Sequence, residues 1–466
     1  MPTPDAGGTQ PRRRPWHRRM PAGLSYTGAL SPAGDVRFLA DTSWVDEDGT
    51  RHNEQQIFDA VFDMIRRARK LIVLDMFLYN DFEMQIKEPL RLLSSELTDA
   101  LLEQKAKHPG MTIVVITDPI NTVYGSIESP YFRKLEAAGI RVVKTNLRAL
   151  RDSSPLYSLL WRFLVRPLGN SKRDRIRNPF DPKGRISLRS YLEMFNCKAN
   201  HRKVMVCDGS NSLAAIVSSA NPHDASSANS NVAVRFTGPA AADLLVSENA
   251  VLELSGHETL PVPAVPVPTA VDNSVQVVTE RAIKIAALAI IDGAGGDAKI
   301  DIAAFYVSDR DIIAALKRAR QRGAALRLVL DPNKDAFGYD KHGIPNRPAA
   351  AELVRAGIDL RWYHTHGEQC HIKMLLAEDG QDGARLLLGS ANLTRRNLDD
   401  FNLETNVLVH GGESSAAIRD ARTYFDALWN NREGRQHTET YERYRDESLF
   451  KKSLYRFMEA SGFSEF

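Results

Sequence analysis

Cysteine is scarce in this sequence: Cys197, Cys207 and Cys370 are the three among 466 residues. So few, in an odd number, cannot form a disulfide framework, and they form no CxxC pair of the kind that binds metals. Apolar runs are also short, and none reaches the roughly 18 to 20 residues that a membrane-spanning helix requires. We therefore expect neither a disulfide-stapled secreted domain nor a membrane-spanning protein, but a protein of a reducing compartment.

A large excess of one charge is lacking as well. The chain has 61 Lys and Arg against 58 Asp and Glu, a formal net charge of +3, with 43% hydrophobic and 26% charged residues. This composition is globular and supplies two or three cores. The charge is uneven, however, because residues 144–203 hold fifteen Lys or Arg and four acidic residues, a local charge of +11.

The basic segment also holds the apolar and aromatic stretch LYSLLWRFLVRPL. Its composition suits an anionic lipid surface, with Tyr157, Trp161 and Phe163 entering the interface while arginines meet phosphates. A nucleic-acid backbone fits nearly as well. A third interpretation is a helical hairpin whose apolar face packs on its own domain.

Two halves with the same order of elements are separated by the proline-rich run LPVPAVPVPT, residues 260–269. In each half a helix leads into an apolar strand, and after a second helix another strand ends at Asp118-Pro119 or Asp331-Pro332. Alternation of helices and strands predicts α/β domains, and its repetition predicts a duplicated fold. The expected divisions are a basic flexible tail (1–35), a first repeat (36–258) with a basic insert (about 146–199), a linker (259–270), a second repeat (271–432) and a C-terminal helical tail (433–466).

The residues that indicate chemistry occur once in each half. The first half reads NHRKVMVCD and then SSAN, with His201, Lys203, Asp208, Ser219 and Asn221. The second reads CHIKMLLAE and then GSAN, with His371, Lys373, Glu378, Ser390 and Asn392.

Strand geometry explains the spacing within each copy. Residues two apart on a strand share a face, so each His projects together with the Lys two positions later. The Ser-x-Asn pair ends the next strand at a turn, where short polar side chains and backbone N–H groups can hold phosphate oxygens. Displacement at a phosphodiester needs a nucleophile, an acid for the leaving oxygen and fixed cations. Two His-x-Lys pairs supply all of these, and we expect neither a metal nor another cofactor.

These motifs resemble those of the phospholipase D superfamily, in which HxKxxxxD followed by GSxN occurs in each of two repeats. The resemblance covers residues 36 to about 432 and implies two tandem α-β-α sandwich repeats, pseudo-two-fold related, each with a mixed, largely parallel sheet. It also implies a covalent phosphohistidine intermediate. Ser218 replaces the Gly of the first GSxN, and Glu378 replaces the Asp of the second motif.

Carried over residue by residue, the resemblance makes His201 and His371 the nucleophile and general acid. It makes Lys203, Lys373, Ser219, Ser390, Asn221 and Asn392 ligands of the phosphoryl oxygens, with Asp208 and Glu378 completing the catalytic motifs.

The family also uses an acidic residue to hold the other ring nitrogen of a histidine, and the two halves differ here. NLETNV, with Glu404, matches ANSNVAV, with Asn229. We expect Glu404 to raise the pKa of His371 and Asn229 to fix the tautomer of His201, so that His201 is the nucleophile and His371 the acid. Asp224 is close enough in sequence to take the place of Asn229.

The motifs alone do not select the phosphodiester. The basic, apolar insert and the fused repeats favour a lipid enzyme similar to a bacterial phospholipase D or cardiolipin synthase. Such an enzyme takes a phospholipid and an alcohol or water, and lies on the inner face of the cell membrane as a peripheral cytoplasmic protein. A nuclease of the same family and a non-catalytic membrane or nucleic-acid adaptor are the alternatives. One site between the repeats requires only a monomer.

Overall fold

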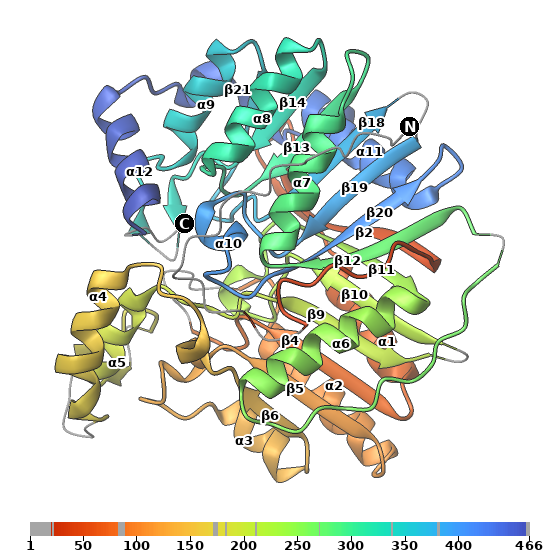
Figure 1. Cartoon of the computed structure of the whole chain (residues 1–466), viewed down its shortest axis with the longest axis vertical. Coiled ribbons are helices and arrows are strands. Elements are labelled where there is room, and N and C mark those ends of the chain that lie inside the picture. The colour runs from red at the N-terminus through yellow and green to blue at the C-terminus, as the bar shows by residue number, and fades with distance from the viewer. Residues whose placement is uncertain are drawn as a thin grey trace, which may run out of the picture.

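Two large mixed sheets, one from each half of the chain, form the centre of the computed structural model (Figure 1). The structure describes residues 20, 23–82, 89–170, 176–181, 184–209, 212–269, 271–336, 339–379 and 383–462. The statements below on what is absent or counted refer to these residues.

The sheet of the first half has the strand order β3-β2-β11-β10-β9-β4-β5-β6. Its strands are β2 (Gly34–Val45), β3 (Arg51–Glu54), β4 (Leu71–Met76), β5 (Thr112–Thr117), β6 (Arg141–Lys144), β9 (Lys203–Asp208), β10 (Leu213–Ser218) and β11 (Asn231–Thr237).

The sheet of the second half has the order β1-β12-β20-β19-β18-β13-β14-β17-β21. Its strands are β1 (Ser31–Pro32), β12 (Asn273–Thr279), β13 (Lys299–Ala304), β14 (Ala325–Leu330), β17 (Asp359–Tyr363), β18 (Lys373–Asp379), β19 (Gly383–Gly389), β20 (Thr405–Gly411) and β21 (Thr438–Thr440). The short pairs β7 (Ile176–Arg177) with β8 (Arg185–Ile186), and β15 (Asp335–Ala336) with β16 (Tyr339–Asp340), lie outside both sheets.

The two sheets repeat one topology, which confirms the predicted pair of similar α/β halves. β2-β11-β10-β9-β4-β5-β6 corresponds strand by strand to β12-β20-β19-β18-β13-β14-β17. Parallel pairing is limited to β4-β5-β6 and β13-β14-β17. The sheets are therefore mixed but not largely parallel, because the later strands of each half follow one another through short connections, which force antiparallel pairing.

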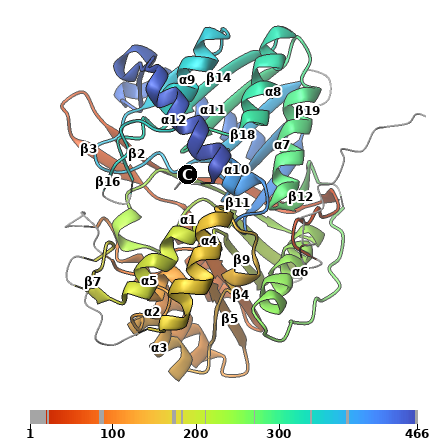
Figure 2. The same ribbon diagram turned by 60° about the vertical axis from the view of Figure 1, so that its left-hand side comes forward.

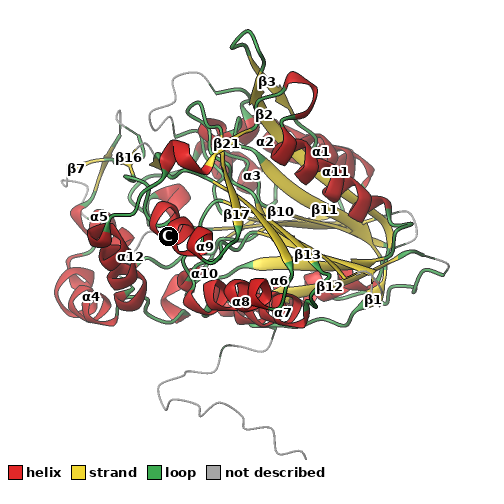
Figure 3. Ribbon diagram, turned by 90° about the horizontal axis from the view of Figure 1, so that it is seen from above, coloured by secondary structure: helices red, strands yellow, loops and turns green. Residues whose placement is uncertain are grey.

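Helices cover both faces of the strands. Figure 3 shows the strands between a layer containing α1 and α11 and another containing α6, α7 and α8. α1 is amphipathic, with Ile57, Phe58, Val61, Phe62 and Ile65 buried against the sheet at helical spacing. Outside the basic insert, the described helices are α1 (Ile57–Arg67), α2 (Leu93–Lys107), α3 (Pro130–Ala137), α6 (Pro239–Leu254), α7 (Arg281–Gly293), α8 (Arg310–Gln321), α9 (Asn346–Arg355), α10 (Arg395–Leu398), α11 (Ala416–Asn430) and α12 (Leu449–Ser461).

The halves share one continuous apolar core rather than packing as separate bodies. Its members include Val204 and Phe236 of the first half and Val407 and Phe425 of the second. Strand β1 pairs with β12, and Gly28 N–H donates to the Val277 carbonyl. Residues 24–35, which the sequence assigns to a flexible tail, are thus part of the fold, since they extend the sheet of the second half.

The basic insert connects β6 to β9, where the second half passes from β17 to β18 in nine residues. It contains α4 (Pro155–Leu160), a π-helical turn (Trp161–Val165), a 3-10 turn (Arg166–Leu168), the β7-β8 pair and α5 (Leu188–Glu193). The Trp161 side chain is buried, with 5% of its surface exposed, whereas Phe163 is 72% exposed. The prediction that Trp161 enters an interface is therefore wrong, because this ring anchors the insert to itself, with Arg189 over its face.

The C-terminal segment contributes both a strand and a helix. β21 pairs with β17 and forms the edge of the sheet, and α12 packs through Tyr455 against Phe305 and Tyr306. The opposite side of α12 is exposed at Leu449, Phe450 and Phe457. None of the described helices combines the length and the apolar character that crossing a membrane demands.

Candidate active site

The two His-x-Lys motifs meet where the halves touch. Each histidine lies directly before the central strand of its sheet, β9 or β18. His201 N–H donates to the Leu403 carbonyl at 2.8 Å, and Ser230 N–H donates to the Gln369 carbonyl at 3.0 Å. The residues before β9 are thus hydrogen-bonded to the segment before β20, and the residues before β18 are hydrogen-bonded to the segment before β11.

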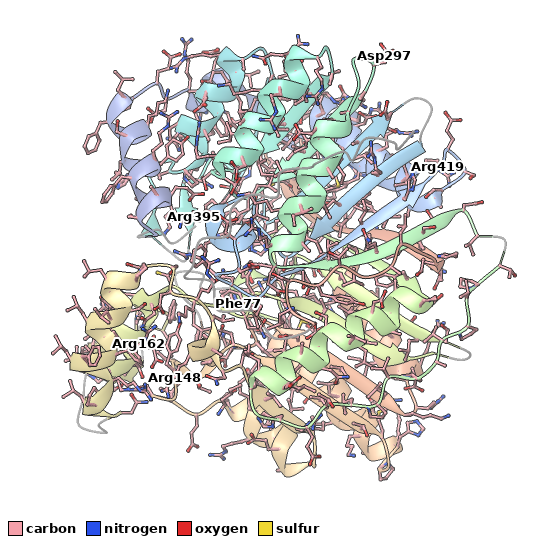
Figure 4. The ribbon with its side chains drawn as sticks, in the orientation of Figure 1. Phe77, Arg148, Arg162, Asp297, Arg395 and Arg419 are labelled. Atoms are coloured by element: carbon pink, nitrogen blue, oxygen red, sulfur yellow. The ribbon has the colours of Figure 1, made fainter. Side chains whose placement is uncertain are left out.

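This pairing brings the two imidazoles together. Their ring centroids are 6.5 Å apart, and each residue is 8% exposed. Phe77 lies 4.7 Å from the His201 ring, and Phe305 lies 5.4 Å from the His371 ring. Figure 4 shows Phe77 at the junction of the halves. The two rings can therefore reach a single small group from both halves of the chain.

Each imidazole is oriented by a residue of the opposite half. The His201 Nδ1 atom lies 3.0 Å from Glu404 Oε2, and the His371 Nδ1 atom lies 3.1 Å from Asn231 Oδ1. The expected partners were Glu404 for His371 and Asn229 for His201, and both expectations are wrong. Asn229 instead accepts a hydrogen bond from the Gln369 backbone.

The expectation failed because the two motif copies differ in length after the Ser-x-Asn pair. Twelve positions separate Asn392 from Glu404, but ten separate Asn221 from Asn231, since α10 lengthens the second connection. Matching the Asn-Val pairs of the two copies therefore shifts the alignment by two residues. The alternative, Asp224, is also excluded, because its carboxylate accepts from the Ser94 backbone and hydroxyl.

The two lysines are buried beside the histidines. Lys203 Nζ donates to the His201 carbonyl at 2.6 Å, and Lys373 Nζ donates to the His371 carbonyl at 2.8 Å. Each ammonium lies about 5 Å from the ring of Phe77 or Phe305. Neither forms an ion pair within the described part of the chain, so both charges can serve a ligand.

The Ser-x-Asn residues divide into two kinds. Ser219 donates to Asn231, and Ser390 donates to Glu404, so the two hydroxyls hold the residues that orient the imidazoles. Asn221 accepts from the Leu78 backbone at 3.3 Å. Asn392 Oδ1 is buried and has no hydrogen-bond partner among the described residues. The amides are therefore better placed than the hydroxyls to meet a ligand.

Asp208 and Glu378, the last residues of the two motifs, lie away from this site. Asp208 accepts from the backbone of Arg69, Lys70 and Leu71, and Glu378 pairs with Arg422. Five residues along an extended strand span about 17 Å, which carries both carboxylates to the far strand ends. Their contacts are structural, and the prediction that they are catalytic is wrong.

Two aspartates that the motifs do not include fix the backbone of the site. Asp118 accepts from the Asn200 N–H at 2.7 Å, and Asp331 accepts from the Cys370 N–H at 2.8 Å. Each therefore anchors the residue just before a motif histidine. The signal was present in the sequence, because Asp-Pro ends the equivalent strand in both halves.

The electrostatics of the site favour an anion. Burial, with the charges of Lys203 and Lys373, lowers the pKa of both histidines well below the ordinary value. Burial also lowers the pKa of Lys203 to about 7, and burial together with Lys203 lowers that of Lys373. Burial raises the pKa of Glu404 to about 7. A bound anion would reverse the shifts of the cationic groups, since it stabilises their protonated forms.

Binding of inorganic phosphate should consequently take up protons. At pH 8 the Lys203 amine of the empty site is largely neutral, and a bound phosphate raises its pKa, so we expect uptake of about one to two protons per phosphate. Calorimetry in two buffers of different ionisation enthalpy measures this number. The Lys203→Met variant should take up fewer protons, and identical heats in both buffers would contradict the electrostatic description.

Arg202, between His201 and Lys203 of the first motif, belongs to a buried charge network. Its guanidinium pairs with Glu248 at 2.9 Å and with Glu280 at 2.6 Å, and all three side chains are fully buried. Glu280 also accepts from the Glu404 backbone N–H. The network therefore links α6 and α7 to the residue that orients His201.

Replacing this arginine should destabilise the fold strongly. Arg202→Met leaves two carboxylates buried without their partner, so we expect the free energy of unfolding to fall by about 3 to 5 kcal/mol. Denaturant unfolding measures the loss, and Arg419→Met, which removes an exposed arginine of α11, is the matched control. A loss below about 1 kcal/mol would show that the network does not stabilise the fold.

Two cavities of the structure are lined by residues outside the two motifs. Two cavities of about 260 and 370 Å³ share Lys284, Arg395 and Asp399 in their lining, and no motif residue lines either. In the described residues, His, Cys, Asp and Glu side chains form no group of three that could hold a metal ion. The candidate site therefore consists of the histidines, the lysines and the residues that hold them.

The chain is similar to known proteins in part of its sequence and in its fold. Residues 288–429 match the model of a family described as cardiolipin synthase, PLD-like domain. The phosphatidylserine synthase of Haemophilus influenzae Rd KW20 has a similar fold, with a TM-score of 0.55 and 11% identity over 94% of this chain and 96% of that chain.

Two further solved structures match with lower TM-scores. Nuc, a phospholipase D family member from Salmonella typhimurium, is 22% identical over 37% of this chain and 99% of its own, with a TM-score of 0.29. A polyphosphate kinase from Porphyromonas gingivalis is 13% identical over 92% of this chain and 53% of its own, with a TM-score of 0.45. The sequence matches none of the curated proteins compared with it. Residues 288–429 are thus a phospholipase D-like domain, and the resemblance of the chain to the phospholipase D superfamily, carried first by its two motifs, is confirmed.

Proposed function

We propose that this protein cleaves the phosphodiester of a glycerophospholipid and transfers the phosphatidyl group to an alcohol or to water. The observation that carries the proposal is the facing pair of imidazoles, 6.5 Å apart, with each Nδ1 atom held by the opposite half. This leaves both Nε2 atoms for one phosphorus group. The ammonium groups of Lys203 and Lys373, which form no ion pair in the described structure, supply the positive charge that such a group needs.

The reaction follows from the different partners of the two rings. Glu404 stabilises positive charge on His201, which develops when its Nε2 atom attacks phosphorus. The bond from phosphorus to the leaving oxygen then breaks, and that oxygen takes the Nε2 proton of His371. Asn231 gives His371 no such stabilisation, so its proton leaves more readily.

The second step reverses these roles. Water or an acceptor alcohol gives its proton to His371 and attacks phosphorus, and the phosphorus–nitrogen bond to His201 breaks. Hydrolysis and transfer differ only in the attacking molecule. We thus propose for His201 the nucleophilic role predicted from the sequence. The reason differs, because Glu404 contacts His201 and not His371.

A lipid substrate is favoured by the surface beside the site. Exposed apolar residues crowd two neighbouring segments: the insert carries Leu156, Leu159, Leu160, Phe163, Leu164 and Leu168, and α12 carries Leu449, Phe450 and Phe457. Figure 2 shows α12 and α4 on the same side of the molecule, one in each half. Basic residues such as Arg148, Arg162 and Arg166 accompany them. We infer a peripheral contact with an anionic membrane, which apolar side chains favour over a nucleic-acid backbone.

Removing apolar side chains from this surface should weaken membrane binding. Phe163→Ser combined with Leu164→Ser is expected to lower affinity for phosphatidylglycerol vesicles about tenfold or more, since both side chains would leave the acyl region. Vesicle flotation measures the affinity, and Val267→Ser, which changes an exposed apolar residue of the linker, is the matched control. Equal binding by the insert variant and the wild type would contradict the assignment of this surface.

The proposed activity itself is tested with purified protein, phosphatidylglycerol vesicles and EDTA, with and without glycerol, and mass spectrometry of the lipids. Phosphatidic acid or cardiolipin formed by the wild type but not by His201→Asn supports the proposal. If lipids remain intact while DNA or RNA is cleaved in a His201-dependent manner, the enzyme is a nuclease instead.

A further inference from the structure

Arg396 is a partly buried arginine with two guanidinium nitrogens that have no hydrogen-bond partner among the described residues. It lies on the short helix α10, four residues after Asn392 of the second motif. Its Nε and Nη2 atoms are buried and have no hydrogen-bond partner in the described structure, and no ion pair there involves this residue. Leaving buried guanidinium nitrogens unsatisfied is costly, so such a group usually awaits a ligand or has a carboxylate beside it.

The neighbouring arginine shows the contrast. Arg395 donates to the backbone carbonyls of Glu459 and Ala460, and its guanidinium lies over the Phe401 ring. It therefore joins α10 to α12. The Nε and Nη2 atoms of Arg396 make no such structural contact in the described part of the chain, although both arginines belong to α10.

Arg396 lies next to the candidate active site, because the following residue, Asn397, donates to Glu404, which holds the His201 Nδ1 atom. Its charge contributes to the low pKa of His201, and it also acts on Tyr124 of the first half and on Glu459 of α12. Glu459 is not available as a partner, because its Oε1 atom accepts from Ser308 and from the Arg395 backbone and no ion pair joins it to Arg396. Arg396 thus lies between the two halves, within electrostatic reach of the attacking imidazole.

Arg396 adds a third cationic group to those of the two lysines. Buried carboxylates lie within electrostatic reach of the lysines, namely Glu404 with Asp118 for Lys203 and Glu404 with Asp331 for Lys373, whereas Arg396 forms no ion pair in the described structure. A phosphodiester carries one negative charge. A second anionic group on the same ligand would complement the remaining positive charge, and a planar guanidinium pairs well with two oxygens of a phosphate or carboxylate.

We propose that Arg396 binds a second anionic group of the substrate, a phosphate or a carboxylate attached close to the phosphodiester that is cleaved. This inference rests on the proposed function for its lipid substrate, and it adds a preference for anionic over uncharged head groups. Arg396 is in this view a specificity-determining residue.

Binding of small anions tests the subsite without any turnover. Calorimetry compares pyrophosphate, which can fill both positions, with inorganic phosphate, which fills one. The wild type should bind pyrophosphate about 10- to 100-fold more tightly than phosphate, and Arg396→Gln should lose most of this preference. Arg281→Gln removes an exposed arginine near α10 and changes the net charge by the same amount, but it should keep the preference for pyrophosphate.

A second variant keeps the test decisive if Arg396→Gln does not fold. Arg396→Lys retains the charge but not the paired donors, so it should retain a reduced preference for pyrophosphate. A folded Arg396→Gln or Arg396→Lys protein that prefers pyrophosphate as strongly as the wild type would overturn the proposal.

Assays with different lipids then identify the second anion and separate this inference from the proposed function. If Arg396→Gln lowers kcat/KM for phosphatidylserine alone, the second anion is a carboxylate. If it lowers kcat/KM for a pyrophosphate-linked diacylglycerol lipid alone, the second anion is a phosphate. An equal fall for phosphatidylglycerol would overturn a role in head-group selection. If no lipid is turned over, the proposed function fails, while the anion-binding result still decides the role of Arg396.

Discussion

Substitution of the two histidines should give different defects, although the motifs that contain them look alike. His201→Asn removes the nucleophile, and we expect turnover of every substrate to fall at least about 10⁴-fold. His371→Asn removes the acid, which should cost about 10²- to 10⁴-fold with a natural lipid. A p-nitrophenyl phosphodiester has a leaving group that needs no proton, so with this substrate His371→Asn should still release p-nitrophenolate in a burst of about one equivalent per protein.

Stopped-flow absorbance measures the burst in both variants. The difference arises because the first step needs only His201 when the leaving group is good, whereas the second step still lacks its base. A burst from His201→Asn and none from His371→Asn would reverse the assignment. Melting curves control for folding, since both side chains are nearly buried.

Glu404→Gln should be the most damaging substitution among the residues that orient the imidazoles. The carboxylate holds the His201 Nδ1 atom at 3.0 Å, and it is fixed in turn by Ser390 and Asn397. An amide cannot stabilise the positive charge that forms on the ring, and it can present the wrong tautomer. We expect turnover to fall by about 10²- to 10⁴-fold, as carboxylate-to-amide changes at catalytic histidines do.

The matched control is Glu378→Gln, at the far end of β18. Its carboxylate pairs with Arg422 and lies outside the site, so turnover should stay near that of the wild type. Steady-state assays on both variants measure the effect. Comparable turnover by Glu404→Gln and the wild type would exclude the carboxylate from catalysis, and a large loss in Glu378→Gln would return that residue to the active site.

The repeated fold and the His-x-Lys positions could be predicted from the sequence because both rest on local patterns. The order of helices and strands recurs across the linker, and residues two apart on a strand share a face. The same local rule fails for Asp208 and Glu378. They belong to the sequence motif, but a strand carries them about 17 Å beyond the lysines.

The orienting residues required knowledge of how the halves meet. Glu404 reaches the histidine of the first half, and Asn231 reaches that of the second, so neither contact is local in sequence. The two-residue difference around α10 hid the equivalence of these positions. Arg396 was missed for a related reason, since unpaired guanidinium nitrogens become visible only when their surroundings are known.

Detection of a covalent intermediate on His201 would test the two-histidine mechanism directly. The His371→Asn protein, mixed with a p-nitrophenyl ester of phosphatidic acid and quenched in base, should carry a phosphatidyl group on the peptide that contains His201, as mass spectrometry of digested protein would show. The two-histidine account predicts this adduct on His201 and none on the His201→Asn protein. An adduct on another residue, or continued turnover with no adduct at any time, would contradict it.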